Sequence, residues 1–127
     1  MQLTVKKHLN QLPSAFILDM DGSFFLGDAL LPGALEILDW FNKNEIRFTF
    51  LTNNTSRGKL EYVAKLTGMG VKQEDVRIYS AGDATIAYLK SNFPGKKVFL
   101  VGTESLQRNF LDGGIDLVED DPDVLVL

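Results

Sequence analysis

Residues 16–23 read Phe-Ile-Leu-Asp-Met-Asp-Gly-Ser, and this stretch decides the fold class. An apolar run over residues 15–18 is rich in strand formers and ends in charge. Such a run is typical of a strand that is buried on both faces of a sheet. Asp19 and Asp21 follow it directly. They therefore stand where open parallel sheets bind their ligands, beyond the carboxyl end of a strand.

The rest of the chain alternates between strand and helix patterns. Strands are expected at residues 47–51, 76–79 and 97–101, with further candidates at 115–118 and 124–127. Helices are expected from Pro32 to Asn44, from Ser56 to about Thr67, from Ser80 to about Asn92, and over residues 104–111. This alternation predicts βαβ units and a mostly parallel, Rossmann-like sheet, and hence an α/β protein.

Three local details can also be predicted. Ser80 and Asp83 have the spacing of a capping box at a helix start. The turn residues within 22–31 indicate an irregular excursion that exposes Phe24 and Phe25. The buried face of the helix that starts at Ser56 is expected to carry four residues: Leu60, Val63, Ala64 and Thr67.

Composition excludes several classes of function. The 127 residues fit one ordinary domain, and 45% hydrophobic content is enough for a packed core. A net charge of -4 without a Lys/Arg block argues against a nucleic-acid partner. The absence of cysteine excludes disulfides and thiolate chemistry, and the lone His8 is expected to be a surface residue. No apolar run approaches a membrane span, so no membrane partner and a cytoplasmic location are expected.

Asp19 and Asp21 form the sharpest candidate site. Residues i and i+2 of an extended chain point the same way, so both carboxylates can face one pocket. This is costly unless a cation joins them or one of them takes a proton, and both solutions serve phosphoryl transfer. A hard cation such as Mg²⁺ prefers oxygen ligands, while one carboxylate can attack phosphorus and the other can protonate the leaving oxygen. The alternative is that both are simply turn residues.

Three further residues extend this site. Gly22 allows a sharp turn that is expected to present backbone N–H groups to phosphate oxygens. Thr52 follows the next predicted strand, which as a parallel neighbour brings it beside Asp19. There the Thr52 hydroxyl and the Asn53 amide are expected to bind phosphate without adding charge. The polar Thr55 that follows is interpreted as a loop residue.

These residues resemble the haloacid dehalogenase-like phosphohydrolases. Residues 16–23 are similar to the first motif of that superfamily, and residues 48–52, Phe-Thr-Phe-Leu-Thr, to its second. The wider pattern is similar to the NagD-like, para-nitrophenyl-phosphatase branch. The stretches that carry this wider resemblance are Gly27 and residues 31–34, 51–56, 66–70, 97–102 and 122–124.

The resemblance implies a role for each candidate residue. Asp19 is implied as the nucleophile and Asp21 as the acid/base residue. A Mg²⁺ ion is implied at the Asp19 carboxylate and the Asp21 carbonyl. The phosphate of a small phosphorylated metabolite is implied to bind at four residues: Asp21, Gly22, Thr52 and Asn53.

The resemblance also predicts how the chain is divided. The lysine of the family's third motif and the acids of its fourth have no counterpart, and in this branch both follow a cap domain inserted after the third core strand. By that analogy residues 1–94 are the N-terminal part of the core, and residues 95–127 begin a truncated α/β cap. We expect such a chain to be inactive alone and a homo-oligomer to form through the cap. Ser23 stands where the family commonly has threonine, so the hydroxyl is kept.

Two rival functions and the choice of substrate stay open. A response-regulator receiver domain is an α/β protein of this length with a phosphorylated aspartate, but it has adjacent acids after its first strand, whereas Met20 separates Asp19 from Asp21. A catalytically inactive binding module on the same fold is the other rival, since two motifs are missing. Sugar phosphates, nucleotides, phosphoglycolate and pyridoxal phosphate are all compatible substrates.

Overall fold

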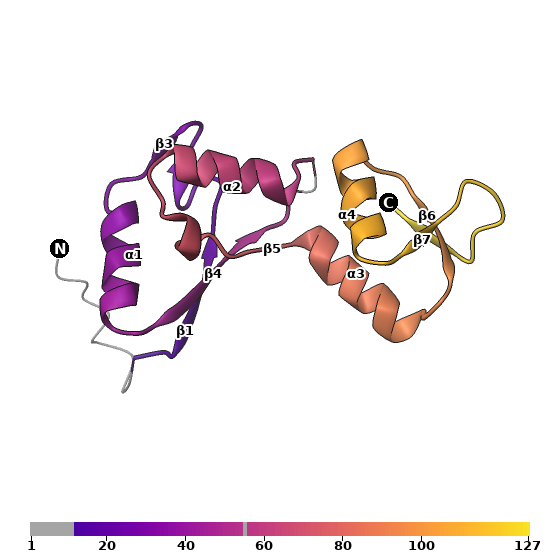
Figure 1. Ribbon diagram of the computed structural model, residues 1–127, viewed down its shortest axis with the longest axis horizontal. Coiled ribbons are helices and arrows are strands. Elements are labelled where there is room, and N and C mark those ends of the chain that lie inside the picture. Colours follow the sequence, from indigo (N-terminus) through magenta and orange to yellow (C-terminus); the bar gives the residue numbers. More distant parts are fainter. Residues whose placement is uncertain (1–11, 55) are drawn as a thin grey trace.

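The structure, a computed structural model, describes residues 12–54 and 56–127. It confirms the predicted α/β class with parallel sheets. His8 and Thr55, for which the sequence makes predictions, lie outside the described residues. Figure 1 shows two α/β units along the chain. The elements of the first unit are β1 (Ala15–Asp19), β2 (Phe25–Leu26), β3 (Ala29–Leu30), α1 (Ala34–Lys43), β4 (Arg47–Thr52), α2 (Lys59–Gly68), the short 3-10 helix η2 (Gln73–Asp75) and β5 (Ile78–Ser80).

The first unit is built on a three-stranded sheet in the order β1-β4-β5. Both strand pairs are parallel, and their register sets Asp19 beside Leu51 and Thr52 beside Ser80. Helices α1 and α2 bury their apolar residues in one core with one face of this sheet. Aromatic rings dominate that core, and the Phe41 and Phe48 ring centroids lie 5.4 Å apart. The carboxyl ends of all three strands therefore meet at one edge of the sheet.

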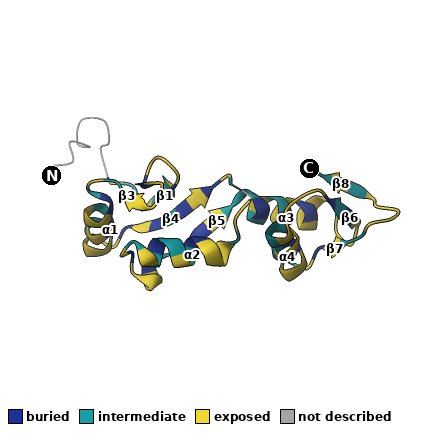
Figure 2. Ribbon diagram, turned by 90° about the horizontal axis from the view of Figure 1, so that it is seen from above, coloured by how far each residue is buried: buried dark blue, intermediate teal, exposed yellow. Residues whose placement is uncertain are grey.

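The second face of this sheet is largely uncovered. Ile17 is 73% exposed, and Leu51 and Tyr79 are also exposed. The prediction that residues 15–18 form a strand buried on both faces is therefore wrong for this chain. The physical reason is that α1 and α2 pack against the other face only, and exposed residues therefore occur between buried ones along β4 in Figure 2.

The segment between β1 and α1 is more ordered than the sequence indicates. Strands β2 and β3 form an antiparallel hairpin, and Phe24 and Phe25 are buried. The prediction that both rings are exposed is wrong, because each finds a partner in the core or on α2. Phe24 packs edge-on against Phe50 with ring centroids 4.9 Å apart, and the Lys65 ammonium lies 4.3 Å from the centre of the Phe25 ring.

The helix after β4 starts later than expected and buries a different face. Gly58, rather than Ser56, precedes its first turn, and the Ser56 amide and hydroxyl instead donate to the Asn54 side chain. The packing of this helix buries Tyr62 and Leu66 in the core and leaves Leu60 84% exposed. The predicted face is therefore wrong for Leu60 and Ala64, which are exposed, whereas Val63 packs against the core and Thr67 is half-buried. Likewise, Pro32 does not open α1, since its first residue is Ala34.

The second unit has its own sheet and its own core. Its elements are α3 (Ala81–Asn92), β6 (Lys97–Leu100), α4 (Glu104–Asp112), β7 (Asp116–Leu117) and β8 (Val124–Val126). The sheet is parallel with strand order β7-β6-β8, and α3 and α4 share its core. The boundary between residues 94 and 95 stays a prediction, although α3 already places Ile86 and Leu89 in this second core. The predicted capping box is confirmed, since Ser80 Oγ accepts the Asp83 N–H over 3.1 Å.

Candidate active site

The predicted site residues gather at the carboxyl edge of the first sheet. Asp19 ends β1, Thr52 ends β4, and the parallel pairing of these strands makes Leu51 the neighbour of Asp19. Asp21 follows two residues beyond β1, and Asn53 follows β4 directly. The structure therefore brings both predicted motifs to the same edge, as the strand pattern of the sequence requires.

Met20 anchors the turn that carries the two aspartates. Its side chain is fully buried, whereas Asp19 and Asp21 on either side of it are exposed. The Met20 carbonyl accepts the N–H groups of Phe24 over 2.9 Å and of Ser23 and Phe25 over 3.2 Å. One buried residue thus fixes the backbone from which both carboxylates project.

Gly22 makes the turn, but its amide is already engaged. A φ of +80° is the left-handed conformation that glycine adopts without steric cost, so the predicted sharp turn is confirmed. The Gly22 N–H donates to the Phe25 carbonyl over 2.8 Å. The Gly22 N–H is therefore already paired, and the binding of phosphate by backbone N–H groups of this turn stays a prediction. By contrast, no backbone hydrogen bond within the described part of the chain uses the peptide groups of Asp21.

Each aspartate has a side-chain hydroxyl as its partner. Ser23 Oγ donates to Asp19 Oδ2 over 2.8 Å. The Tyr62 hydroxyl donates to Asp21 Oδ2 over 3.3 Å. The sequence did not predict Tyr62 as a site residue, because a different buried face was expected for this helix. The signal that could have found it is its spacing of four residues from Leu66, the other buried residue of α2.

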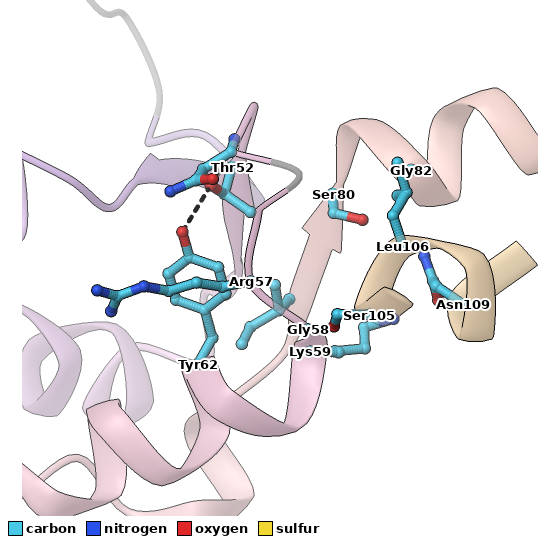
Figure 3. Close-up of a pocket in the computed structure, with 12 residues that line it drawn as sticks. Thr52, Arg57, Gly58, Lys59, Tyr62, Ser80, Gly82, Ser105, Leu106 and Asn109 are labelled. Carbon is cyan, nitrogen blue, oxygen red and sulfur yellow. Dashed lines mark hydrogen bonds between the residues drawn. The ribbon is translucent and has the colours of Figure 1, made fainter. Parts of the chain in front are cut away.

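Thr52 is held rigidly beneath this edge. It is 4% exposed, and its hydroxyl oxygen accepts the Asn54 N–H over 3.1 Å. The same hydroxyl donates to the Tyr62 oxygen over 3.5 Å, as the dashed line in Figure 3 marks. Asn53 is exposed. Thr52 is therefore a fixed part of the sheet edge, whereas the Asn53 side chain is reachable from solvent.

The oxygen donors at this edge suit a hard divalent cation. Carboxylates and backbone carbonyls are the ligands that Mg²⁺ and Ca²⁺ prefer, and Asp19 and Asp21 supply both kinds. The described residues contain no cluster of three or more histidine, cysteine, aspartate or glutamate side chains that could hold a metal ion. The donors present thus fit part of a metal site, with the Asp21 carbonyl free of backbone partners among the described residues.

A small cavity of about 20 Å³ lies beside Thr52, where the two units meet. Figure 3 shows Ser105 of α4 beside Gly58 and Lys59 at the start of α2, whereas Asn109 of α4 lies toward Gly82 of α3. The Lys59 ammonium lies 3.2 Å from Asp83 Oδ2 and so joins the units across this seam. Burial raises the pKa of Asp83, but the Ser80 backbone N–H, the Lys59 ammonium and the Ser80 hydroxyl outweigh burial and lower this pKa below its ordinary value.

The chain matches a known protein family over most of its length. A sequence family described as haloacid dehalogenase-like hydrolase matches residues 16–116, which includes both motifs at the sheet edge. The chain belongs to this family. Among its described residues, no helix is long and apolar enough to span a membrane.

Individual members of the haloacid dehalogenase-like family are similar to this chain. Phosphoglycolate phosphatase 1A of Arabidopsis thaliana is 37% identical over 93 residues, which cover 72% of this chain and 26% of the relative. The crystal structure of 4-nitrophenylphosphatase from Thermotoga maritima matches with a TM-score of 0.83 and 41% identity, over 88% of this chain and 43% of that one. The resemblance to the para-nitrophenyl-phosphatase branch is thereby confirmed.

A third similar protein was solved with a metal ion. The glycerol phosphate phosphatase from Mycobacterium tuberculosis, in complex with calcium, matches with a TM-score of 0.69 and 31% identity. That match covers 89% of this chain and 34% of the solved one. The haloacid dehalogenase-like chain described here spans less than half the length of each of these three proteins.

Proposed function

We propose that the complete protein is a Mg²⁺-dependent phosphatase that hydrolyses phosphate monoesters of small metabolites through an aspartyl-phosphate intermediate. The observation that carries this proposal is the placement of Asp19 and Asp21 directly after β1, with Thr52 at the end of the neighbouring strand β4. Membership of the haloacid dehalogenase-like hydrolases supports it, as do similar proteins that are named phosphatases.

In the first half of the proposed reaction, a carboxylate oxygen of Asp19 attacks phosphorus. The bond from phosphorus to the leaving oxygen breaks, and Asp21 gives its proton to that oxygen. In the second half, water attacks the aspartyl phosphate while Asp21 takes a proton from the water. The bond from phosphorus to the Asp19 oxygen then breaks, which releases inorganic phosphate and restores both carboxyl groups.

The neighbouring groups hold these two residues and the phosphate. The Ser23 hydroxyl orients Asp19 through its 2.8 Å hydrogen bond. Thr52 and Asn53 bind phosphate oxygens, with Asn53 as the more accessible of the two. The Asp19 carboxylate and the Asp21 carbonyl would hold Mg²⁺, which offsets the charge of the phosphate when bound. Gly22 contributes by shaping the turn, because its own N–H bonds to Phe25.

The proposal is tested by assaying the complete protein with para-nitrophenyl phosphate, with Mg²⁺ and after its removal by a chelator. We expect metal-dependent release of phosphate, and we expect Asp19→Asn to abolish both turnover and the trapping of a beryllofluoride adduct. Asp120→Asn, at an exposed aspartate of the second unit, is the matched control and should keep full activity. Near-normal turnover by Asp19→Asn would contradict the proposed nucleophile.

One alternative has a specific observation in its favour. The described residues provide two carboxylates at the site and no third acid for a metal, which is what a catalytically inactive binding module on this fold would also show. Such a module binds a phosphorylated ligand without releasing phosphate. Isothermal titration with phosphorylated metabolites, run beside the phosphatase assay, separates the two functions. Binding without release of phosphate indicates the binding module, and release of phosphate indicates the phosphatase.

A further inference from the structure

We infer that Tyr62 is a positioning residue that holds the Asp21 carboxylate in place and ties it to Thr52. This inference rests on the proposed function, since it assigns Tyr62 a part in the same reaction. Tyr62 lies on α2, outside both sequence motifs, and is 2% exposed. Its ring belongs to the core of the first unit, while its hydroxyl reaches the edge of the sheet.

The Tyr62 hydroxyl stands between two residues that come from different strands. It donates to Asp21 Oδ2 over 3.3 Å, and it accepts from Thr52 Oγ1 over 3.5 Å. Asp21 follows β1, and Thr52 ends β4. A single buried side chain thus links the proposed acid/base residue to the proposed phosphate-binding threonine.

The proton directions in this chain of hydrogen bonds follow when Asp21 is ionised and no phosphate is bound. A carboxylate only accepts, so the one proton of the Tyr62 hydroxyl points to Asp21. The Thr52 proton then points to the Tyr62 oxygen, while the Thr52 oxygen accepts the Asn54 N–H over 3.1 Å. Every donor points toward the Asp21 carboxylate, which the network therefore holds in one orientation.

The two hydroxyl contacts are longer than the typical O–H···O distance of about 2.7–2.8 Å. Hydrogen bonds of catalytic groups are often long without substrate and tighten in the substrate complex. Because Tyr62 is anchored in the core by its ring, its hydroxyl is a fixed point toward which the Asp21 side chain can move by a few tenths of an ångström. The exposed Asp21 has no other side-chain hydrogen bond within the described part of the chain.

A plain structural role predicts something different for the same residue. A buried tyrosine usually finds a hydrogen-bond partner for its hydroxyl, and the contact with Asp21 alone would satisfy it. In that case removing the hydroxyl changes stability or affects all substrates alike. A positioning role instead weakens proton donation by Asp21, so its effect grows as the leaving group becomes poorer.

The test is Tyr62→Phe in the complete protein, which keeps the ring and removes only the hydroxyl. Tyr88→Phe is the matched control, because Tyr88 is a 59% exposed tyrosine of α3. Turnover is measured with Mg²⁺ on para-nitrophenyl phosphate, which has a good leaving group, and on an alkyl phosphate, which has a poor one. For Tyr62→Phe we expect kcat on the alkyl phosphate to fall about tenfold, as befits one hydrogen bond to a charged group. On para-nitrophenyl phosphate we expect kcat of Tyr62→Phe to fall by less than about threefold. KM should stay nearly unchanged for both substrates.

A double-mutant cycle with Asp21→Asn completes the test. If Tyr62 acts through Asp21, adding Tyr62→Phe to Asp21→Asn costs less than about twofold, because the group that it positions is already inactive. Equal losses on both substrates, or a full tenfold additional loss in the Asp21→Asn background, would overturn the inference and leave the proposed function intact. Absence of phosphatase activity in the unsubstituted protein and in Tyr88→Phe alike would instead refute the proposed function, and the inference with it.

Discussion

Asp83 is expected to stabilise the junction between the two units, and Asp83→Asn tests how strongly. Its Oδ2 atom accepts from the Ser80 backbone N–H over 2.9 Å and from Ser80 Oγ over 3.0 Å, and it lies 3.2 Å from Lys59 Nζ. Three donors therefore converge on one oxygen of a side chain that is 17% exposed. Asparagine keeps the shape of this group and removes its charge.

The size of the effect follows from these contacts. Hydrogen bonds to a charged acceptor contribute about 1 kcal/mol more than those to a neutral one. The partly exposed ion pair with Lys59 adds about 0.2–1 kcal/mol, and a carboxylate in the first turn of α3 adds about 0.3–1 kcal/mol. The cost of burying the charge offsets part of this sum. We therefore expect Asp83→Asn to lower the free energy of unfolding by about 1–2 kcal/mol at pH 7.

The pH dependence gives this prediction a sign that can be checked. The pKa of Asp83 is lowered in the folded protein from an ordinary value of 3.8. A lowered pKa means that the stabilisation is present above the unfolded-state pKa and is lost as the pH falls through the folded-state value. The difference in the free energy of unfolding between the original protein and Asp83→Asn should therefore be largest at pH 7 and shrink below about pH 4.

Urea unfolding of the 127-residue protein between pH 3 and pH 7, followed by circular dichroism, measures this difference. Lys59→Gln removes only the ion pair and should cost less than about 1 kcal/mol, and Asp120→Asn is the exposed control with no expected effect. An Asp83→Asn variant as stable as the original protein at pH 7 would refute the reasoning. So would a difference in stability that stays constant down to pH 3.

Four other predictions concern the site and the seam between the units. In the complete protein, Asp21→Asn should slow hydrolysis of an alkyl phosphate by about 10²–10⁴-fold while phosphate-analogue binding persists. Ser23→Ala should lower kcat by about fivefold through loss of one exposed hydrogen bond to Asp19, and Ser23→Thr should restore it; equal rates for both variants would contradict this role. Gly58→Ala places a methyl group against Ser105 Oγ, so it should destabilise the protein by about 1 kcal/mol in urea unfolding, and Ser105→Gly should relieve that loss. Residues 1–127 alone should show negligible Mg²⁺-dependent hydrolysis of para-nitrophenyl phosphate, since no third acid stands beside the site among the described residues.

The sheet and the position of the site could be predicted because each depends on local signals. Apolar strands that alternate with helices specify a parallel sheet, and the carboxyl ends of its strands specify one edge. Asp19 and Thr52 therefore came together as expected. The capping box at Ser80 was predictable for the same reason, since all of its atoms lie within four residues.

What could not be predicted depends on contacts between distant residues. The burial of Phe24 depends on Phe50, which comes from a strand far along the chain. The buried face of α2 depends on how the helix packs against the sheet. Its start at Lys59 depends on Ser56, which bonds to the Asn54 side chain instead of capping the helix. Positions along a helix share a face by their spacing, wherever the helix starts, so only the packing of α2 in the core makes Tyr62 and Leu66 its buried residues.

Ser80 is at once the last residue of β5 and the residue that caps α3. In the sheet it lies beside Thr52, and from its own peptide begins the helix that supplies Ile86 and Leu89 to the second core. No linker intervenes between the two roles. The start of α3 is therefore joined through a single residue to the strand pair that holds Thr52 at the edge, so the orientation of the second unit and the position of Thr52 depend on the same Ser80 peptide.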